Sequence, residues 1–284
     1  QDFKTGETQL VQRKKGAPPI EGYLIFIDEA SYIDAQLLAY IFRLTKNCKI
    51  VFMGDPAQLT PVKSSCTPVF TSGFPGAHLS QVVRQAEGNP IIDLSTKFRM
   101  TVSSGEFFSF KPDGVAIKHM NRSDFEDEIL KEVKSPNWHH DTSKVLAWTN
   151  KTVIAYNNAI RDHIQGDPEL AEGDYAICNK YISKSGNSIK TDAMVYINMI
   201  GPTVVEHGVE GNYYNVDYAA IPFFMPKHLK DKKALLKKAK DEENIYLLAE
   251  IENSWIDLRA AYACTVNKAQ GSTYDKVFID LDDI

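Results

Sequence analysis

The stretch that decides the fold is Tyr23-Leu24-Ile25-Phe26-Ile27-Asp28-Glu29-Ala30-Ser31, in which five apolar or aromatic residues end at two adjacent carboxylates. A short apolar run of this kind predicts a buried strand of a parallel sheet. Asp28 and Glu29 then lie at the carboxyl end of the strand, the edge where open α/β sheets bind ligands. Because a carboxylate buried there needs a partner or a metal, Asp28 is a candidate Mg²⁺ ligand and Glu29 is placed to handle a water molecule. The alternative is a strand that ends at a turn, with Asp28 capping the next helix.

A second strand is expected after one helix. Residues 34–44 carry an apolar stripe at helical spacing, and Asp34 is a suitable N-cap. Residues 49–53 are again apolar and run into Gly54-Asp55-Pro56-Ala57-Gln58-Leu59-Thr60-Pro61-Val62. Strand, helix and strand form one right-handed βαβ unit, so both strands end at the same edge of the sheet. Four side chains are therefore expected to converge there as a phosphate site, unless residues 54–56 form a plain turn: Asp28, Glu29, Asp55 and Gln58.

The composition is that of an ordinary globular protein. The chain has 284 residues, of which 43% are hydrophobic and 24% are charged, and its formal net charge is −5. This length predicts more than one domain, and the acidic balance argues against a wholly basic nucleic-acid binder while allowing a local basic channel. The four cysteines form no CxxC pair, which indicates reduced thiols of a cytosolic protein. The sequence shows no signal peptide and no apolar run of membrane-spanning length, so no membrane partner is expected.

A second α/β region is predicted from Leu79 onward. Residues 89–90, Asn-Pro, are typical of a helix start, and the buried side of that helix is expected to be Ile91, Ile92 and Phe98. Residues 123–126 have the spacing of a capping box and predict the start of a further helix. Residues 144–148 predict another buried strand, which is followed by a helix with an apolar stripe.

The pattern changes between Glu172 and Asn253. Short β-like runs alternate there with Gly, Pro, Ser and Asn, which predicts a small all-β module inserted into the second α/β region. Residues 227–244 are highly charged and predict an exposed helix, whose lysines are expected to form a solvated face rather than a nucleic-acid contact. Residues 245–251 predict a return to strand.

The α/β pattern resumes near the end of the sequence. Residues 262–273 (YACTVNKAQGST) precede an apolar strand at residues 276–281. Lys268 and Gly271 are suited to bind phosphate together, through positive charge and exposed backbone N–H groups. Taken alone this signal is weak, because many loops contain Lys and Gly.

Taken together, several stretches resemble the motifs of superfamily 1 helicases. Asp28-Glu29-Ala30-Ser31 is similar to the Walker B motif, and Gly54-Asp55-Pro56-Ala57-Gln58-Leu59 is similar to the motif that follows it. Val83-Arg84-Gln85 resembles the arginine motif that opens the second RecA-like domain, and residues 265–272 resemble the next-to-last motif. With residues 146–151 (LAWTNK) between them, the order and spacing are most similar to the RecD-like branch, and within it to the Dda-type helicases of tailed bacteriophages. The resemblance covers nearly the whole chain.

The resemblance implies an α/β fold with two RecA-like parallel-sheet domains and an SH3-like β module inserted in the second. Residues 1–78 would be the C-terminal part of the first domain, residues 79–171 and 254–284 the second domain, and residues 172–253 the inserted module. In this family ATP lies between the two domains and single-stranded DNA lies across their top. Membership of the branch implies 5′-to-3′ movement.

The resemblance also implies residue roles. Asp28 would hold Mg²⁺, Glu29 would orient the attacking water, Gln58 would sense the γ-phosphate, and Arg84 would stabilise developing charge on that phosphate. The other nucleotide contacts would be Asp55, Gln270 and Gly271. Movement along DNA must ignore base sequence, so the residues that line the DNA path would contact backbone phosphates. Those residues are Thr149, Asn150, Thr265 and Lys268.

Three features depart from the family pattern. No G-x-x-x-x-G-K-[ST] loop occurs in these residues, and the final arginine motif expected after residues 276–279 is missing. Asn267 stands where Dda-type proteins commonly carry histidine. We therefore expect a fragment that lacks both ends of the family's motif set and that does not hydrolyse ATP efficiently by itself.

The leading hypothesis is an ATP-dependent 5′-to-3′ DNA helicase and single-stranded DNA translocase that uses ATP and Mg²⁺. It would act as a monomer in the cytoplasm, that of a bacterial host if a phage encodes it, on single-stranded DNA and duplex junctions. A single-stranded-DNA-binding protein is a candidate partner. The alternative is a non-catalytic, helicase-derived module that grips DNA or a partner protein. A nucleotide hydrolase that does not act on DNA is a third hypothesis, disfavoured by residues 265–272 and by the inserted β module.

Overall fold

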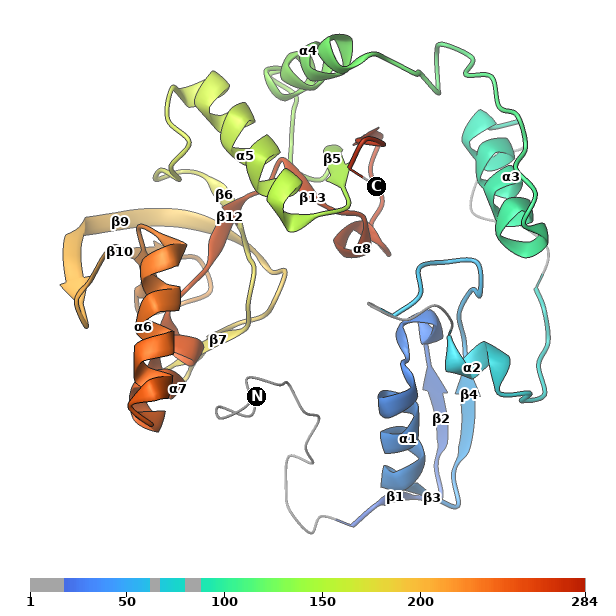
Figure 1. Ribbon diagram of the computed structural model, residues 1–284, viewed down its shortest axis with the longest axis horizontal. Helices are drawn as coiled ribbons and strands as arrows, with labels where there is room; N and C mark the ends of the chain where they lie inside the picture. The colour runs from blue at the N-terminus through green and yellow to red at the C-terminus, as the bar shows by residue number, and fades with distance from the viewer. Residues whose placement is uncertain (1–17, 62–66, 80–87, 284) are drawn as a thin grey trace. The chain divides into compact units, whose positions relative to one another are not determined.

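The computed structural model describes residues 18–61, 67–79 and 88–283, in which helices alternate with several small sheets (Figure 1). These residues divide into two compact units, a first unit of residues 18–119 and a second unit of residues 120–283. The units join between His119 and Met120, later in the chain than the boundary expected at residues 78–79, and the domain division given above stays a prediction. None of the described helices combines the length and the apolar character needed to cross a lipid bilayer.

The first unit is built on two parallel strands, β2 (Leu24–Ile27) and β4 (Lys49–Phe52), which pair in register along their whole length. The 3-10 helix η1 (Ala30–Tyr32) and helix α1 (Ala35–Leu44) connect them. A second, short parallel pair consists of β1 (Ile20–Glu21), which precedes β2, and β3 (Thr45–Lys46), which follows α1. Asp34 caps α1, since its Oδ1 accepts a hydrogen bond from the Leu37 N–H at 2.7 Å. The predicted strand–helix–strand unit and its cap are therefore confirmed.

Only one face of the β2–β4 sheet is covered by the described elements. Ile27 and Phe52 pack on that side against a small core that includes Leu38. On the other face, Leu24 and Phe26 are 58% and 60% exposed. The expectation that residues 23–27 form a fully buried strand is thus wrong. Successive strand residues point to opposite faces, and within the described residues helices cover only one of them.

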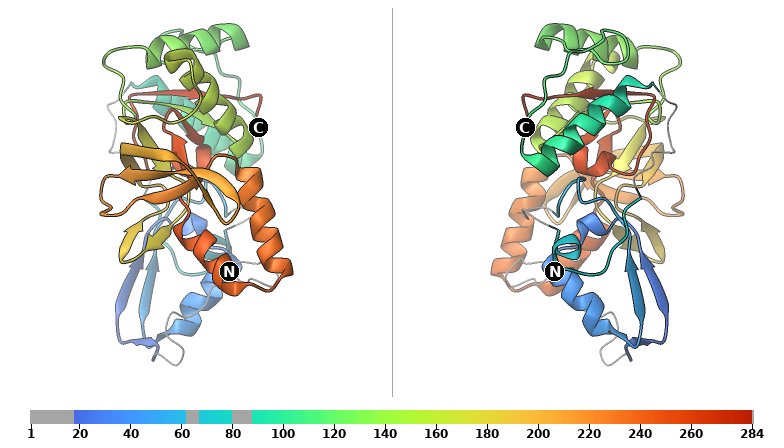
Figure 2. Two further views of the ribbon diagram at one scale, coloured as in Figure 1. Left: turned by 90° about the vertical axis from the view of Figure 1, so that its left-hand side faces the viewer. Right: turned by 90° about the vertical axis from the view of Figure 1, so that its right-hand side faces the viewer.

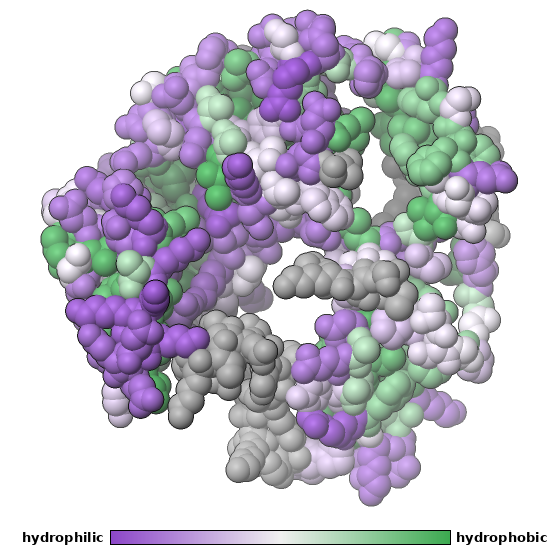
Figure 3. All heavy atoms as spheres, in the orientation of Figure 1, coloured by the Kyte–Doolittle hydropathy of each residue, from purple (hydrophilic) through white to green (hydrophobic). Residues whose placement is uncertain are grey.

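Helices α2 (Pro68–Thr71) and α3 (Pro90–Ser104) complete the regular structure of the first unit. Asn89 caps α3 as predicted, because its side chain accepts a hydrogen bond from the Ile91 N–H at 2.9 Å. No residue of α3 is buried, and Phe98 is 62% exposed, so the expected buried side of this helix is wrong. Figure 3 shows hydrophobic residues at the surface over α3. A helix can bury an apolar stripe only against another element, and residues 105–119 form neither helix nor strand.

The second unit contains a three-stranded parallel sheet with β5 (Ser143–Ala147) at its centre. Strands β13 (Ala263–Thr265) and β14 (Lys276–Ile279) pair with it on either side. Helices α4 (Arg122–Val133) and α5 (Asn150–Gln165) share a core with this sheet. Every residue of β5 is buried, as predicted for a strand inside a parallel sheet.

Helix α4 starts earlier than the capping-box spacing indicated. Asn121 is the N-cap, and its Oδ1 accepts a hydrogen bond from the Asp124 N–H at 2.9 Å. The predicted start at Ser123 is therefore wrong, because the amide oxygen of Asn121 already satisfies the free N–H group at this helix end.

An antiparallel five-stranded sheet follows, in the order β11-β10-β9-β6-β12. Its strands, in chain order, are β6 (Tyr175–Cys178), β9 (Met194–Glu206), β10 (Val209–Val216), β11 (Phe223–Pro226) and β12 (Leu258–Ala260). A separate hairpin of β7 (Ile182–Lys184) and β8 (Asn187–Ile189) lies between β6 and β9 in the chain. The short β-strands predicted after Glu172 are therefore present, and β12 extends the sheet beyond Asn253.

Two helices, α6 (Leu229–Asp241) and α7 (Ile245–Ser254), pack together against one side of this sheet. Figure 2 shows α6, in orange, running beside the strands, and its surface in Figure 3 is hydrophilic, as predicted for the charged segment. The prediction of a strand at residues 245–251 is wrong, since these residues form α7. Asn244 caps α7 by accepting from the Leu247 N–H at 3.1 Å, and the buried Leu248 and Ile251 lie three residues apart, a spacing that serves a helix face.

Candidate functional site

The first part of the candidate site is the edge of the first unit at which β2 and β4 both end. Asp28 and Glu29 follow β2 directly, and residues 54–58 follow β4. Two backbone hydrogen bonds tie these exits together: the Met53 N–H donates to the Ile27 carbonyl at 2.8 Å, and the Ala30 N–H donates to the Met53 carbonyl at 2.9 Å. The two acidic segments thus leave the sheet side by side.

Asp28 and Glu29 are both exposed at this edge. Glu29 adopts a left-handed conformation, with φ 52°, and its N–H donates to Asp28 Oδ1 at 2.9 Å. Within the described part of the chain, neither carboxylate forms an ion pair, and Asp28 does not cap α1. Burial, and then the charge of Glu29, raise the pKa of Tyr32. The two carboxylates therefore face outward as a negatively charged pair.

Gly54 is required by the close approach of the two exits. A Cβ at this position would lie 2.9 Å from the Ala30 backbone nitrogen and 3.2 Å from the Phe70 ring. The first of these separations is below any normal carbon contact, and the obstacle is backbone. A side chain at position 54 would push the residue 53–58 loop away from Asp28 and Glu29.

Asp55 is paired with Arg99, a contact that the sequence reasoning missed. Arg99 Nη1 donates to Asp55 Oδ1 at 2.8 Å, and Nη2 contacts Oδ2, so the pair is bidentate. The hydrogen bond from Arg99, and next to it that from the Ala57 N–H, hold the pKa of Asp55 below its usual value. No sequence signal identifies this partner, because the two residues are 44 positions apart.

The chemistry of this edge fits a Mg²⁺-bound phosphate. Oxygen ligands, and carboxylates above all, are the ligands that Mg²⁺ prefers. Arg99 already neutralises Asp55, which leaves Asp28 and Glu29 as the exposed carboxylates of the edge. The Ser31 hydroxyl, just after Glu29 in the chain, is buried without a hydrogen-bond partner among the described residues. It is therefore available to hydrogen-bond a polar ligand at this edge.

Gln58 lies at the end of the same loop, where its N–H donates to the Asp55 carbonyl at 3.2 Å. The first unit therefore places four of the predicted residues, Asp28, Glu29, Asp55 and Gln58, in the two segments that follow β2 and β4. Arg84 lies outside the described residues.

A second group of predicted residues lies in the second unit, at the N-terminus of α5. Thr149 is the N-cap of this helix, and Asn150 is its first residue. The carboxylate of Asp283 accepts hydrogen bonds from the Trp148 and Thr149 N–H groups, both at 2.7 Å, and from the Thr149 and Thr152 hydroxyls at 3.0 Å and 2.5 Å. This helix end therefore already holds an anionic group from the chain itself.

Thr265 and Lys268 meet at the short helix α8 (Val266–Ala269). Thr265 is its N-cap and accepts a hydrogen bond from the Lys268 N–H at 3.3 Å. The ammonium of Lys268 donates to Asp192 Oδ1 at 2.5 Å and to Asn179 Oδ1 at 2.8 Å. Both partners precede or follow strands of the antiparallel sheet, and sequence reasoning missed them for the same reason as Arg99.

Gln270 and Gly271 follow α8 directly. Gly271 has φ 80°, a left-handed conformation that glycine adopts without strain, and the Ser272 N–H donates to the Ala269 carbonyl at 3.0 Å. These residues form a tight turn between α8 and β14.

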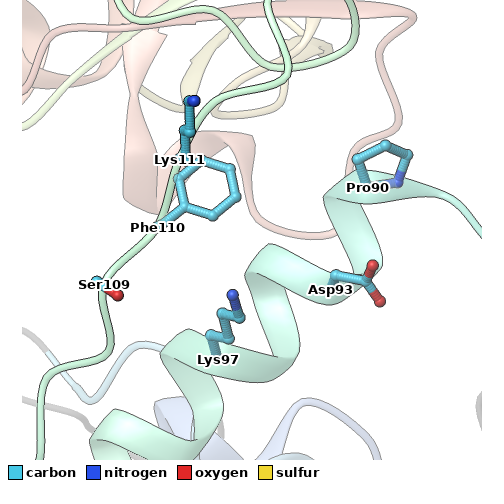
Figure 4. A pocket seen from close by; sticks show the side chains of 6 residues that line it. All are labelled: Pro90, Asp93, Lys97, Ser109, Phe110 and Lys111. Atoms are coloured by element: carbon cyan, nitrogen blue, oxygen red, sulfur yellow. The ribbon is translucent and has the colours of Figure 1, made fainter.

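The first unit also contains an open cavity between α3 and residues 109–111. Figure 4 shows Lys97 on the helix and Lys111 on the facing segment beside the Phe110 ring. The Lys97 ammonium lies 5.8 Å from the centre of that ring, a weak cation–π contact. Among the residues that the structure describes, no predicted site residue lines this cavity.

Comparison with known proteins gives three findings. Residues 8–107 match the protein family described as AAA domain. The ATP-dependent DNA helicase dda of Enterobacteria phage T4 is 24% identical over 330 residues, which cover 97% of this chain and 72% of that protein. An uncharacterized protein of Acanthamoeba polyphaga mimivirus is 20% identical over 344 residues, which cover 92% of this chain and 69% of that protein.

Among solved structures, the Pif1 helicase from Candida albicans aligns with a TM-score of 0.50 and 17% sequence identity. The alignment covers 92% of this chain and 66% of the Pif1 chain. The chain thus spans about two thirds of that helicase, and the likeness shows a shared α/β fold with parallel sheets.

Proposed function

We propose that this chain, which is related to the Dda-type superfamily 1 helicases, is part of an ATP-driven motor that moves 5′-to-3′ along single-stranded DNA and opens duplexes at junctions. The observation that carries the proposal is that β2 and β4 end side by side, with Asp28 and Glu29 directly after β2 and with Asp55 and Gln58 after β4. Parallel strands that end together present loops and backbone N–H groups to a phosphate ligand. The AAA-domain match over residues 8–107 includes this edge.

Within the nucleotide site, Asp28 would hold Mg²⁺, which when bound would neutralise charge on the phosphates of ATP. Glu29, exposed and free of ion pairs among the described residues, would accept a hydrogen bond from the attacking water and orient it. Gln58 would contact the γ-phosphate from the residue 53–58 loop, whose shape is set by Gly54 and by the Asp55 side chain. We propose Arg84, Gln270 and Gly271 as further nucleotide contacts.

For the DNA path, we propose Thr149, Asn150, Thr265 and Lys268 as contacts to backbone phosphates. Thr149 is the N-cap of the 16-residue helix α5, and the N-termini of such helices favour anionic groups. Lys268 supplies a positive charge beside Thr265. Contacts of this type do not distinguish bases, which a translocating motor requires.

The test is the Glu29→Gln variant of the complete protein. This change keeps the size of the side chain but removes the carboxylate that orients water, so ATP turnover is expected to fall at least a hundredfold. Binding of ATP and of a single-stranded oligonucleotide should stay within about twofold. Glu106→Gln removes a carboxylate at an exposed position of the same unit and should leave turnover intact. Normal turnover by Glu29→Gln would overturn the proposal.

The second candidate is a non-catalytic, helicase-derived module that grips DNA or a partner protein. The coding sequence upstream of Gln1 separates the two candidates. A phosphate-binding loop encoded there supports the motor, and a start codon directly before Gln1 supports the module.

A further inference from the structure

A network of polar side chains crosses the second unit, from the turn before β9 to the start of α5. It begins at Asp192, in the turn before β9, which contacts the Lys268 ammonium at 2.5 Å. The same ammonium donates to Asn179 Oδ1 at 2.8 Å. Lys268, a proposed DNA contact, is therefore held from two sides by residues of the antiparallel sheet region.

The network of polar contacts continues from Asn179 to Asp257. The Asn179 N–H donates to the Asp257 carbonyl at 2.8 Å, and its side-chain amide donates to Asp257 Oδ2 at 2.9 Å. Asp257 in turn faces the Arg259 guanidinium, with Nε 3.4 Å from Oδ1. Arg259 lies on β12 and its Nη1 is 3.3 Å from Asn150 Oδ1, at the start of α5.

One narrow cavity of the second unit is lined by Asn150, Asn179, Arg259 and Lys268, together with Thr265. Arg259 and Lys268 are its two cations, and their side chains keep 21% and 29% of their surface exposed. Three of the four proposed DNA contacts, Asn150, Thr265 and Lys268, thus share a cavity with Arg259. Neither the family motifs nor the sequence pattern singled out Arg259.

We infer that Arg259 is a further phosphate-contacting residue of the DNA path, positioned by Asp257 and Asn179. The inference rests on the proposed function and extends it. A guanidinium presents a planar fork that matches phosphate oxygens, whereas the Lys268 ammonium acts as a point charge. β12 fixes the Arg259 backbone, since Arg259 pairs with Ile177 of β6. The ion pair with Asp257 fixes the side chain and leaves part of the guanidinium accessible to the phosphate.

The experiment measures binding of a fluorescein-labelled oligothymidylate to the full chain by fluorescence anisotropy, at several salt concentrations. Arg259→Gln is expected to weaken binding roughly tenfold and to make the salt dependence shallower by about 0.7 in a plot of log K against log salt. Arg259→Lys keeps the charge but loses the fork, so affinity should fall less and the salt slope should stay unchanged.

Asp257→Asn is the matched control, because the amide oxygen can still accept a hydrogen bond from the Arg259 guanidinium and hold it in place, while the negative charge that competes with phosphate is removed. If Arg259 touches phosphate, Asp257→Asn should bind the oligonucleotide as tightly as the wild type or more tightly. If Arg259→Gln and Asp257→Asn lost the same affinity for the oligonucleotide, Arg259 would act only by holding the local structure together through its ion pair. That result would overturn the inference. Lys131→Gln, which removes one exposed charge from α4, should change neither affinity nor slope.

The outcomes separate this inference from the proposed function. If the wild type binds the oligonucleotide and Lys268→Gln weakens binding while Arg259→Gln does not, the DNA function stands and the role of Arg259 is refuted. If the wild type does not bind the oligonucleotide at any salt concentration, the DNA function fails and the role of Arg259 fails with it.

Discussion

At the scale of single residues, the proposed DNA contacts already have anionic partners within the chain. Asp283 accepts four hydrogen bonds at the N-terminus of α5, and Asp192 contacts the Lys268 ammonium. A carboxylate and a phosphate compete for the same donors, so DNA that binds at these positions must displace the carboxylates. The donors are thereby held in place, with their hydrogen-bonding groups oriented, before a strand arrives.

Asp283→Asn is expected to lower the midpoint of thermal unfolding at pH 7. Hydrogen bonds from the Thr152 hydroxyl and next from the Thr149 N–H lower the pKa of Asp283 below its usual 3.8. A lowered carboxyl pKa stabilises the folded state above the usual value, and this contribution is lost as the pH falls through the lowered pKa. The difference between wild type and variant should therefore shrink below pH 3.8.

Asp282→Asn is the control for this prediction, because it removes the same charge from a neighbouring side chain that has no hydrogen bond among the described residues. Melting curves recorded at pH 7 and at pH 3 provide the measurement. Equal midpoints for the two variants at pH 7 would contradict the role of the Asp283 carboxylate.

At the scale of elements, the α6–α7 pair and the strands beneath it form a tightly packed interface. Trp255, at the end of α7, is 1% exposed and packs on Phe224, with ring centres 4.6 Å apart. Lys232 of α6 is also buried, and its ammonium donates to the Trp255 carbonyl at 3.3 Å. A charged group inside this interface is costly, because one carbonyl does not replace the water that it loses.

Lys232→Met should therefore stabilise the protein at pH 7, by about 1–2 kcal/mol. Burial, and then the charge of Lys180, lower the pKa of Lys232 to about 8. Below pH 8 the buried ammonium is charged and penalises the folded state. Between pH 8 and the usual lysine value, the unfolded chain binds the proton and the folded one does not, so wild-type stability rises with pH.

Urea unfolding at pH 7 and at pH 10 checks this prediction. The advantage of Lys232→Met should be smaller at pH 10 than at pH 7. Lys233→Met, at the neighbouring exposed position of α6, should show no such pH-dependent gain. An identical gain for Lys232→Met at both pH values would contradict the burial argument.

Strand β10 carries a glycine that the packing of β11 requires. A Cβ at Gly211 would overlap the Met225 carbonyl and the Phe224 ring. Gly211→Ala is therefore expected to destabilise the protein by about 1–3 kcal/mol, as overpacking does in well-filled interiors. Gly201→Ala is the matched control, because a Cβ there would lie 3.5 Å from the Tyr213 carbonyl, an ordinary contact. Equal unfolding free energies for the two variants in urea would refute the prediction.

At the scale of the whole molecule, each unit has its own hydrophobic core. Among the described residues, the first unit holds one small cluster around Ala30, Ile33, Leu38 and Val69, while the second holds three clusters of equal or larger size. The proposed nucleotide edge belongs to the first unit and the proposed DNA contacts to the second. Less buried apolar surface gives a smaller free energy of unfolding, so the two units should differ in stability.

The first unit is expected to unfold at lower urea concentration than the second. All three tryptophans, Trp138, Trp148 and Trp255, are in the second unit, so intrinsic fluorescence reports on that unit alone. The circular dichroism transition should therefore begin before the fluorescence transition. Phe70→Trp adds a reporter next to the core of the first unit and should show the earlier transition. Coincident curves from all probes would mean a single cooperative unit.

Local pattern was sufficient where an element's own residues decide its state. The helical stripe and the Asp34 cap predicted α1, and the run at residues 144–148, which is apolar after Lys144, predicted a buried strand. Local pattern failed at α7, whose apolar run fits a strand or a buried helix equally well, and only packing against the sheet and α6 selects the helix. The apolar pattern of α3 also predicted a buried side that the structure does not show, because burial depends on which other element packs against the helix.

The sequence by itself determined the parallel strand–helix–strand order and, through it, the placing of Asp28, Glu29, Asp55 and Gln58 after two strands that end side by side. Handedness and strand direction are local consequences of chain chirality, so a short stretch suffices to specify them. Only the tertiary structure decided which charges are neutralised: Asp55 by Arg99, Lys268 by Asp192, and the α5 N-terminus by Asp283. These partners lie from 44 to 134 positions apart, and a contact over such a separation leaves no period in the sequence.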